Sequence, residues 1–285
     1  MKKLLILSGK GGTGKTTTAA ALIRFSKAKA IADCDVDAPN LHLVTAQTGN
    51  PEVTKFLGGE KAEIDPCKCT GCGSCQLHCR FDAIREKDGT YEVNEYACEG
   101  CGVCEYVCPQ GAVKLVKDAA GRKELYRSDS VFSTATLKMG RGNSGKLVTE
   151  VKMAMQKYAP ETELAIIDGS PGIGCPVIAS VSGADLVLVV AEPSLSGFSD
   201  LERLVKTAEM LRTKLAVCVN KWDVSPEHTE KIQLFCAERK IPFAGKIPYD
   251  KKASEAINAG MSIADLDCPA RNALESIYET IMKLF

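Results

Sequence analysis

The sequence lacks long apolar runs, an excess of either charge, and a set of histidines that could form a site. No apolar run approaches the roughly 20 residues of a membrane-spanning helix, and the first run, residues 4–7, is too short for the apolar region of a signal peptide. The 36 basic residues balance the 36 acidic residues, so bulk charge offers no attraction for nucleic acid or an anionic membrane. We therefore expect a globular cytoplasmic protein with no nucleic-acid partner and no membrane contact.

Cysteine, in contrast, is abundant and unevenly placed. Of the 14 cysteines, ten lie between Cys34 and Cys108. Disulfides would be the first interpretation in a small secreted domain, but this chain has 285 residues and no signal peptide is expected. In a cytosolic protein such clusters are more often metal sites, so the cysteines predict metal binding.

Apolar segments of strand length alternate with helical patterns along most of the chain. Beyond an opening strand, loop and helix, strands are predicted at 30–34, 163–168, 185–191 and 215–220, and helices at 144–158, 196–211, 227–238, 251–258 and 270–284. Continuous apolar runs suit parallel strands that are covered on both faces. The alternation predicts an α/β fold with an open, doubly wound, mostly parallel sheet.

The alternation breaks between about residues 65 and 116, where cysteine and glycine dominate. We expect a small domain inserted there, with exits marked by Gly58-Gly59 and by residues 118–122. The predicted division is a main domain in two parts, 1–60 and 119–285, and an insert at 61–118.

The insert is an internal repeat with an offset of 29 residues. Each half has the pattern C-x2-C-x2-C-x3-C, and the two sets are Cys69, Cys72, Cys75, Cys79 and Cys98, Cys101, Cys104, Cys108. This pattern resembles the bacterial-type ferredoxins, in which the fourth cysteine of each motif ligates the other cluster. The resemblance implies two 4Fe-4S clusters, one held by Cys69, Cys72, Cys75 and Cys108 and the other by Cys98, Cys101, Cys104 and Cys79. A pair of zinc knuckles is the alternative, but it does not explain the duplicated spacing.

The two halves of the repeat are not identical. The second motif ends in Cys108-Pro109, as the ferredoxin pattern expects, whereas the first ends in Cys79-Arg80. The arginine leaves the expected ligands intact but places a cation beside one cluster. Cys67 corresponds to Tyr96 in the other half, so we expect Cys67 to be structural or incidental.

A nucleotide-binding loop follows the opening apolar strand. Residues 9–16 read GKGGTGKT and satisfy G-x4-G-K-[ST] between a strand and a helix. Glycines let backbone amides face the phosphates, Lys15 reaches the β and γ oxygens, and the Thr16 hydroxyl completes the shell of Mg²⁺. The residues expected to bind the nucleotide are Gly11, Gly12, Thr13, Gly14, Lys15, Thr16 and Thr17, together with Asn220 and Lys221.

The early lysine in KGGTGKTT makes this loop similar to the deviant Walker A motif of the MinD/ParA group, which includes Mrp-type ATPases and the nitrogenase iron protein. The resemblance implies a MinD-like P-loop fold, and that Lys10 reaches the partner's nucleotide in a homodimer formed through the nucleotide face. An ordinary solvated loop lysine is the alternative for Lys10.

Two acidic segments match the same group. ADCDVDAPNL, residues 32–41, is similar to a switch I segment, and IIDGSPGIGC, residues 166–175, to a strand followed by switch II. By this resemblance Asp35 orients the attacking water, Asp33 lies in the outer shell of Mg²⁺, and Asp168 holds Mg²⁺ directly or through water.

Three further features leave alternatives open. Residues 220–223 read NKWD, which sits where the group recognises its base and also fits the guanine-reading NKxD pattern; we expect ATP rather than GTP. Cys175 has the same count after Asp168 as a cluster ligand of the nitrogenase iron protein, with a small buried residue as the alternative. The apolar stripe of residues 270–285 resembles the membrane helix of MinD, but core packing is the commoner cause.

The favoured functional hypothesis is a dimeric ATPase in which nucleotide-driven closure is coupled to electron transfer through the two clusters. The rival hypothesis is an ATP-dependent maturation or scaffold protein that delivers clusters or metals. The paired C-terminal thiols of Mrp-type carriers are missing, which weakens the rival. A third hypothesis is a positioning ATPase with a structural insert. The partner, a redox protein or a cluster acceptor, cannot be named from the sequence.

Overall fold

The computed structural model describes residues 1–45, 47 and 49–285, and these divide into two compact units. The large unit contains residues 1–54, 123–136 and 144–285, and the small unit contains residues 55–122 and 137–143. Each unit has a buried apolar cluster of its own. The sequence did not suggest that residues 137–143 would group with the cysteine-rich segment.

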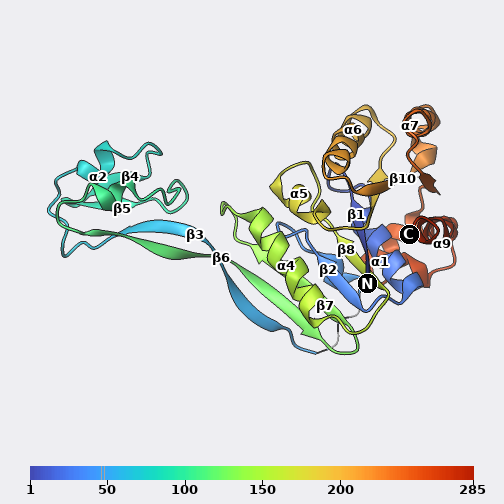
Figure 1. The fold of residues 1–285 in the computed structure, drawn as a ribbon, viewed down its shortest axis with the longest axis horizontal. Coiled ribbons are helices and arrows are strands. Elements are labelled where there is room, and N and C mark those ends of the chain that lie inside the picture. The colour runs from blue at the N-terminus through green and yellow to red at the C-terminus, as the bar shows by residue number, and fades with distance from the viewer. Residues whose placement is uncertain (46, 48) are drawn as a thin grey trace. The chain divides into compact units, whose positions relative to one another are not determined.

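A nine-stranded sheet with the order β11-β10-β9-β1-β8-β2-β7-β6-β3 runs through the large unit, and its strands β3 and β6 continue into the small unit (Figure 1). Its strands are β1 (Lys2–Leu7), β2 (Ala30–Asp33), β3 (Glu52–Ile64), β6 (Val113–Arg127), β7 (Val131–Leu137), β8 (Leu164–Asp168), β9 (Leu186–Ala191), β10 (Lys214–Asn220) and β11 (Phe243–Ile247). β1 pairs in parallel with β8 and β9, and β2 with β7 and β8. The predicted mostly parallel α/β sheet is therefore confirmed.

Helices cover both faces of this sheet. They are α1 (Lys15–Ser26), α4 (Ser144–Tyr158), α5 (Cys175–Val181), α6 (Leu195–Met210), α7 (Pro226–Glu238), α8 (Lys251–Asn258) and α9 (Pro269–Met282). Leu4 and Ile6 of β1 pack in the core with α1 and α9, while Leu5 and Leu7 are equally buried. Because alternate residues of a strand point to opposite faces, β1 is covered on both sides.

The apolar stripe of the last helix packs into this core. Leu274, Ile277 and Ile281 of α9 are at most 1 % exposed, and Tyr278 and Met282 pack partly buried against them. The expectation of core packing is confirmed. Among the described residues, no helix combines the length and the apolar composition that crossing a membrane would need.

The small unit is entered and left by strands rather than by loops. Gly58-Gly59 lies inside β3 and residues 118–122 lie inside β6, close to the unit boundaries at 54/55 and 122/123. A Cβ atom on Gly58 would come within 2.8 Å of the Ala120 side chain, so glycine lets β3 and β6 approach closely. Between them lie α2 (Ser74–Leu77), the antiparallel strands β4 (Ile84–Lys87) and β5 (Thr90–Val93), and α3 (Val103–Tyr106). The predicted domain bounds stay a prediction.

Candidate functional site

The glycine loop between β1 and α1 is braced from the end of β10. Gly12 and Gly14 have left-handed backbone angles, with φ of 79° and 90°. Asn220 Nδ2 donates a hydrogen bond of 2.7 Å to the Thr13 carbonyl, and a Cβ atom on Gly14 would lie 2.2 Å from that nitrogen. Position 14 therefore requires glycine, and Asn220 fixes the shape of the loop whatever its part in base recognition.

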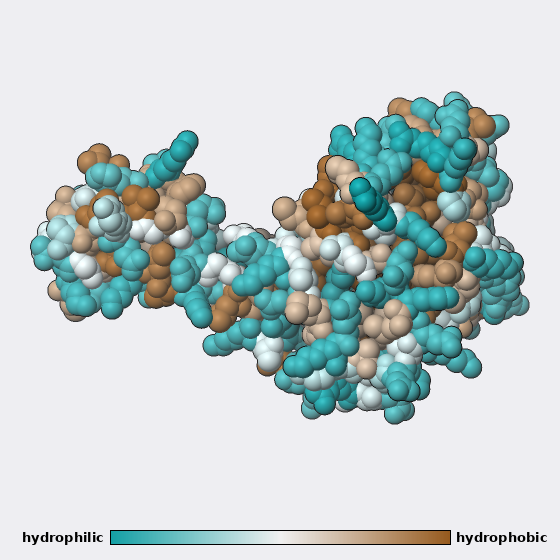
Figure 2. Space-filling model, viewed as in Figure 1, coloured by the Kyte–Doolittle hydropathy of each residue, from teal (hydrophilic) through white to brown (hydrophobic). Residues whose placement is uncertain are grey.

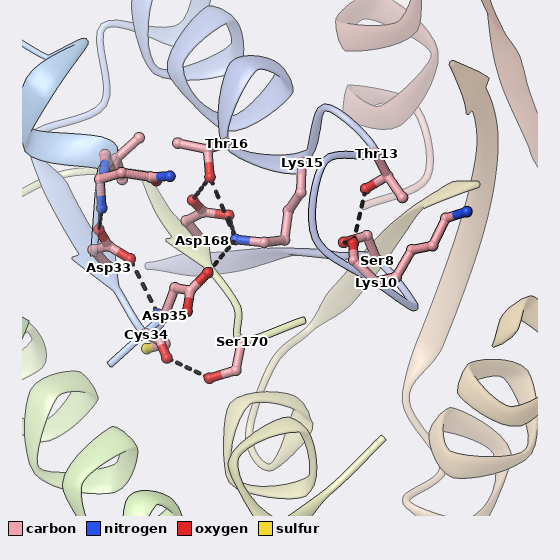
Figure 3. A network of polar contacts seen from close by, with 12 residues as sticks. Ser8, Lys10, Thr13, Lys15, Thr16, Asp33, Cys34, Asp35, Asp168 and Ser170 are labelled. Carbon is pink, nitrogen blue, oxygen red and sulfur yellow. Dashed lines mark hydrogen bonds and ion pairs between the residues drawn. The ribbon is translucent and has the colours of Figure 1, made fainter. Parts of the chain in front are cut away.

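Three predicted residues meet at the end of β8 (Figure 3). Lys15 Nζ lies 2.5 Å from Asp168 Oδ1, and the Thr16 hydroxyl donates to Asp168 Oδ2 at 2.7 Å. Burial acts to lower the pKa of Lys15, but the charges of Asp168 and Asp35 outweigh it and raise this pKa. The hydroxyl and carboxylate oxygens are hard donors of the kind that Mg²⁺ selects, so the side chains present fit the predicted Mg²⁺·nucleotide site.

Asp33 organises the acidic segment after β2. Its carboxylate accepts backbone hydrogen bonds from Asp35 (3.1 Å), Asn40 (3.1 Å) and Leu41 (3.0 Å). Burial, followed by the charge of Asp168, raises the pKa of Asp33 to about 7, while Lys15 and the backbone donors oppose the rise. Asp33 thus shapes the segment that carries Asp35, whose Oδ2 lies 3.9 Å from Lys15 Nζ. The predicted roles of Asp33 and Asp35 toward metal and water stay predictions.

Backbone contacts join the segment after β2 to the segment after β8. The Cys34 N–H donates to the Asp168 carbonyl at 2.7 Å, and the Ser170 hydroxyl donates to the Cys34 carbonyl (Figure 3). Sequence reasoning missed Ser170, although it is the first polar side chain after Asp168. The two predicted switches are hydrogen-bonded to each other beside Lys15.

Lys10 is held by an acidic residue of its own chain. Its Nζ lies 2.5 Å from Glu192 Oε2, and Lys221 Nζ lies 3.8 Å from Glu192 Oε1. Lys10 also donates weakly to the Ser196 hydroxyl at 3.4 Å. Glu192 directly follows the apolar strand β9, a position where the sequence could have drawn attention to it. The action of Lys10 across a dimer stays a prediction.

A hollow lies on the other side of the glycine loop, where the nucleotide base is expected. It is lined by Gly12 and Gly14 of the loop, by polar side chains of α1 and of the end of β10, and by apolar side chains that include Ile247, Pro248, Ile257 and Leu274. Asp223, the last residue of the NKWD segment, accepts a hydrogen bond of 2.7 Å from the Tyr249 backbone N–H through Oδ1. Asp223 therefore fastens the segment after β11, a contact that the NKxD pattern does not indicate.

The eight repeated cysteines surround two cavities in the small unit. One cavity is lined by Cys79, Cys98, Cys101 and Cys104, and the other by Cys69, Cys72, Cys75 and Cys108. Within the described part of the chain, no three His, Cys, Asp or Glu side chains are spaced to hold a single metal ion. The structure thus brings together the two sets of cysteines that the ferredoxin resemblance implies. Each set surrounds a cavity rather than the position of a single metal ion. Ligation itself stays a prediction.

The fourth cysteine of each motif receives backbone hydrogen bonds. The Ala83 N–H donates to Cys79 Sγ at 3.4 Å, and the Ala112 N–H donates to Cys108 Sγ at 3.3 Å. Burial acts to raise the pKa of Cys108, but backbone donors from Ala112 and its neighbours outweigh it and lower this pKa. Donors of this kind favour the thiolate form that iron–sulfur clusters require, whereas burial raises the pKa of Cys75 and Cys104 in the same cavities. The four thiols around each cavity match the ligand number of such a cluster.

Cys67 and Cys175 lie elsewhere. Cys67 is exposed and lines neither cavity. Cys175 is exposed at the first position of α5, not a small buried residue as the alternative supposed. Its place in a shared cluster stays a prediction.

A buried lysine fastens the far end of α5. Lys152 of α4 is 6 % exposed, and its Nζ donates to the carbonyls of Ala179, Ser180 and Ser182 at 2.8, 2.7 and 2.6 Å. These carbonyls belong to the last turn of the helix, which has no intrahelical donors for them. Sequence reasoning missed Lys152, because it falls within an amphipathic helical pattern.

We expect Lys152→Met to lower the free energy of unfolding by about 2 kcal/mol, because it leaves three buried carbonyls without their charged donor. Urea unfolding followed by circular dichroism measures the change. Lys157→Met is the matched control, since Lys157 ends the same helix and lies over the exposed ring of Tyr158. Equal stability of the two variants would contradict the role of Lys152.

A search against protein-family models matches residues 4–263 to the CobQ/CobB/MinD/ParA nucleotide binding domain. An uncharacterized protein of Methanocaldococcus jannaschii is 32% identical over 286 residues, covering 98% of this chain and 96% of its own. An iron-sulfur cluster carrier protein of Pyrococcus abyssi is 26% identical, covering 98% of this chain and 85% of its own.

Solved structures show the same fold. The cell division ATPase MinD of Pyrococcus furiosus superposes with a TM-score of 0.56 at 19% identity, covering 100% of this chain and 99% of its own. At 19% identity, this structural likeness establishes the fold alone.

Proposed function

Since this chain belongs to the CobQ/CobB/MinD/ParA family of nucleotide-binding proteins, we propose that it is an ATPase that acts on iron–sulfur clusters held in its small unit. The proposal of ATPase activity rests on the buried contacts that Lys15 and Thr16 make with Asp168 beside the glycine loop. The two four-cysteine cavities carry the iron–sulfur part. Bound clusters would supply one-electron chemistry or, as cargo, iron and sulfide.

Cluster delivery is the first candidate for this action. Support comes from relatives of similar length that are named iron-sulfur cluster carrier proteins, one of them aligned over 98% of this chain. The face of the small unit drawn in Figure 2 mixes apolar and polar residues. Leu77 and Tyr106, each two residues after a repeated cysteine, are exposed. Apolar side chains beside both cysteine motifs suit transient contact with an acceptor protein.

The test is a transfer experiment under anaerobic conditions. The protein is reconstituted, its iron and acid-labile sulfide are measured, and about eight of each per chain are expected for two 4Fe-4S clusters. It is then mixed with an apo-ferredoxin, with and without Mg·ATP. Delivery predicts loss of the protein's own clusters and their appearance in the acceptor, faster with ATP. Stable clusters that never leave the protein would count against delivery.

Electron transfer is the second candidate, favoured by one observation. Each cavity is lined by four cysteines, so each expected cluster would have a complete set of thiolate ligands, as in permanent electron carriers. Electron paramagnetic resonance of the reduced protein with and without ATP separates the two candidates. Coupling predicts a nucleotide-dependent change in signal or reduction potential that Lys15→Ala abolishes, whereas unchanged spectra would argue against it.

The proposed ATPase acts as a homodimer, as its resemblance to the MinD/ParA group implies. Lys10 cannot reach a partner while it is paired with Glu192. We therefore expect Glu192→Gln to tighten self-association in the presence of an ATP analogue by about two- to fivefold, the scale of a partly exposed ion pair.

Sedimentation velocity over a concentration series measures this change. Glu209→Gln is the control, because it removes the exposed ion pair with Arg239 at 3.1 Å and leaves Lys10 untouched. Weaker self-association of Glu192→Gln would mean that Glu192 supports the dimer instead of restraining Lys10.

A further inference from the structure

The two cysteine motifs of the small unit rest on different supports. In the second motif, a Cβ atom on Gly100 would lie 2.1 Å from the Glu60 carbonyl, and Lys61 Nζ donates to the Cys98 carbonyl. The second motif therefore packs directly on β3. In the first motif, a Cβ atom on the corresponding Gly71 would lie 2.6 Å from the carbonyl oxygen of Gly89, in the turn between β4 and β5. The close contact of a motif glycine with β3 is thus made by Gly100 and not by Gly71, although Ile64 of β3 also lines the cavity of the first motif.

Arg141 clamps residues 137–143, which we name the strap, onto the segment that leads into the second motif. Its side chain is 6 % exposed. Nη1 donates to the Glu95 carbonyl at 2.9 Å, Nη2 pairs with the Glu95 carboxylate, and Nε lies 3.5 Å from Asp118 Oδ2. The guanidinium also lies 5.3 Å from the centre of the Tyr96 ring. A planar guanidinium held on several sides is a rigid connection.

The repeat makes this clamp specific to one half. Glu95 and Tyr96 stand three and two residues before Cys98, and at the 29-residue offset the first half has Pro66 and Cys67 in their places. Neither of these offers a carboxylate or an aromatic ring to an arginine. The clamp therefore distinguishes the two motifs, although their cysteine spacing is the same.

The strap continues directly into α4, which packs against α5, the helix that follows switch II. Ser144, the first residue of α4, comes immediately after the strap. A Cβ atom on Gly145 would lie 3.2 Å from the Cys175 carbonyl, so the first turns of α4 and α5 are in close contact. Lys152 ties α4 to the last turn of α5. Fastened at both ends, α4 and α5 form one rigid pair.

The beginning of α5 is in turn connected to the nucleotide loop. Residues 169–174 join Asp168 to α5, and within them the Gly172 N–H donates to the Ser8 carbonyl at 3.1 Å. A change of position at Asp168 when Mg·ATP binds must therefore be taken up by this short segment and by the helix that it begins.

We propose that Arg141 and the strap couple the nucleotide state of switch II to residues 98–104 of the second motif, so that the cavity lined by Cys98, Cys101 and Cys104 responds to ATP and the other cavity does not. The proposal rests on the proposed function, because it assumes that the large unit binds ATP and that the small unit binds clusters. Arg141 acts as a positioning residue: it touches the segment before Cys98 and neither the nucleotide nor a cluster. The two-state element is the α4–α5 pair with the strap attached.

Hydrogen–deuterium exchange of the reconstituted full-length protein tests this coupling. Peptides covering residues 94–104 and 65–75 are compared with and without a non-hydrolysed ATP analogue. We expect the exchange rates of 94–104 to change by about two- to thirtyfold, the range of measured coupling along such networks, while those of 65–75 stay constant. In Arg141→Gln the response of 94–104 should vanish, although nucleotide affinity and iron content stay as in the wild type.

Arg85→Gln is the control, because Arg85 also pairs with a glutamate, Glu92 at 2.8 Å, but in an exposed position of the β4–β5 hairpin. It should keep the wild-type response. Glu95→Gln, a milder change at the partner, should weaken the response in case Arg141→Gln fails to fold. Equal responses of both motifs, or a response that survives in Arg141→Gln, would overturn the proposal. Missing iron or missing ATP binding in the wild type would instead defeat the proposed function, and both are measured separately.

Discussion

In the Lys15→Ala variant, ATP hydrolysis is expected to fall by about a hundred- to a thousandfold, the usual cost of removing a group that stabilises charge in a transition state. Lys15 is the loop lysine that reaches the phosphates in P-loop enzymes. The structure adds a second cost: Lys15 Nζ lies 2.5 Å from Asp168, whose side chain is fully buried, so removing Lys15 leaves an unpaired carboxylate. Phosphate release under Mg·ATP measures the loss.

Loss of folding could imitate loss of catalysis, because an uncompensated buried charge costs about 3–5 kcal/mol. The double variant Lys15→Met with Asp168→Asn removes both charges and should recover much of the stability without recovering hydrolysis. Lys157→Ala, at the exposed end of α4, should behave as the wild type. Hydrolysis that survives in Lys15→Ala would remove the ATPase part of the proposal.

The second large effect concerns which cysteines share a cluster. Cys79 lines the same cavity as Cys98, Cys101 and Cys104, although it belongs to the other motif in sequence. We therefore expect Cys79→Ser to lose about four of the eight iron atoms and to make Cys98, Cys101 and Cys104 reactive toward an alkylating reagent. The thiols of the other cavity, Cys69, Cys72, Cys75 and Cys108, should stay protected. Mass spectrometry of alkylated peptides measures both.

Cys108→Ser should give the reverse pattern, with Cys69, Cys72 and Cys75 reactive and Cys79 protected. Cys67→Ser, at an exposed cysteine that lines neither cavity, should keep the full iron content. If Cys79→Ser instead exposes the first motif's own thiols, each motif closes its own site and the crossed assignment is wrong.

Strand prediction succeeded for continuous apolar runs, but it missed β7 (Val131–Leu137), which is largely buried and carries serine and threonine within its apolar run, and β11 (Phe243–Ile247). The expected strand at 163–168 corresponds to β8 (Leu164–Asp168), and that at 185–191 to β9 (Leu186–Ala191), since both are apolar runs buried on two faces. β3 and β6 were missed. Most of their side chains are exposed or half-buried, so neither a continuous nor an alternating apolar pattern marks them. Only their pairing shows that they are strands.

The sequence by itself determined the local chemistry of this protein. The glycine loop with Lys15 and the spacing of the eight cysteines are readable because each function is built from residues a few positions apart, whose relative placement the chain itself fixes. What only the tertiary structure decided are the long-range ion pairs: Lys10 with Glu192, and Arg141 with Glu95 and Asp118. Charged side chains are common along the chain, and which of them meet depends on the order of the strands and on where β3 and β6 lead the chain. For that reason the restraint on Lys10 and the connection from switch II to one cysteine motif became visible only in the fold.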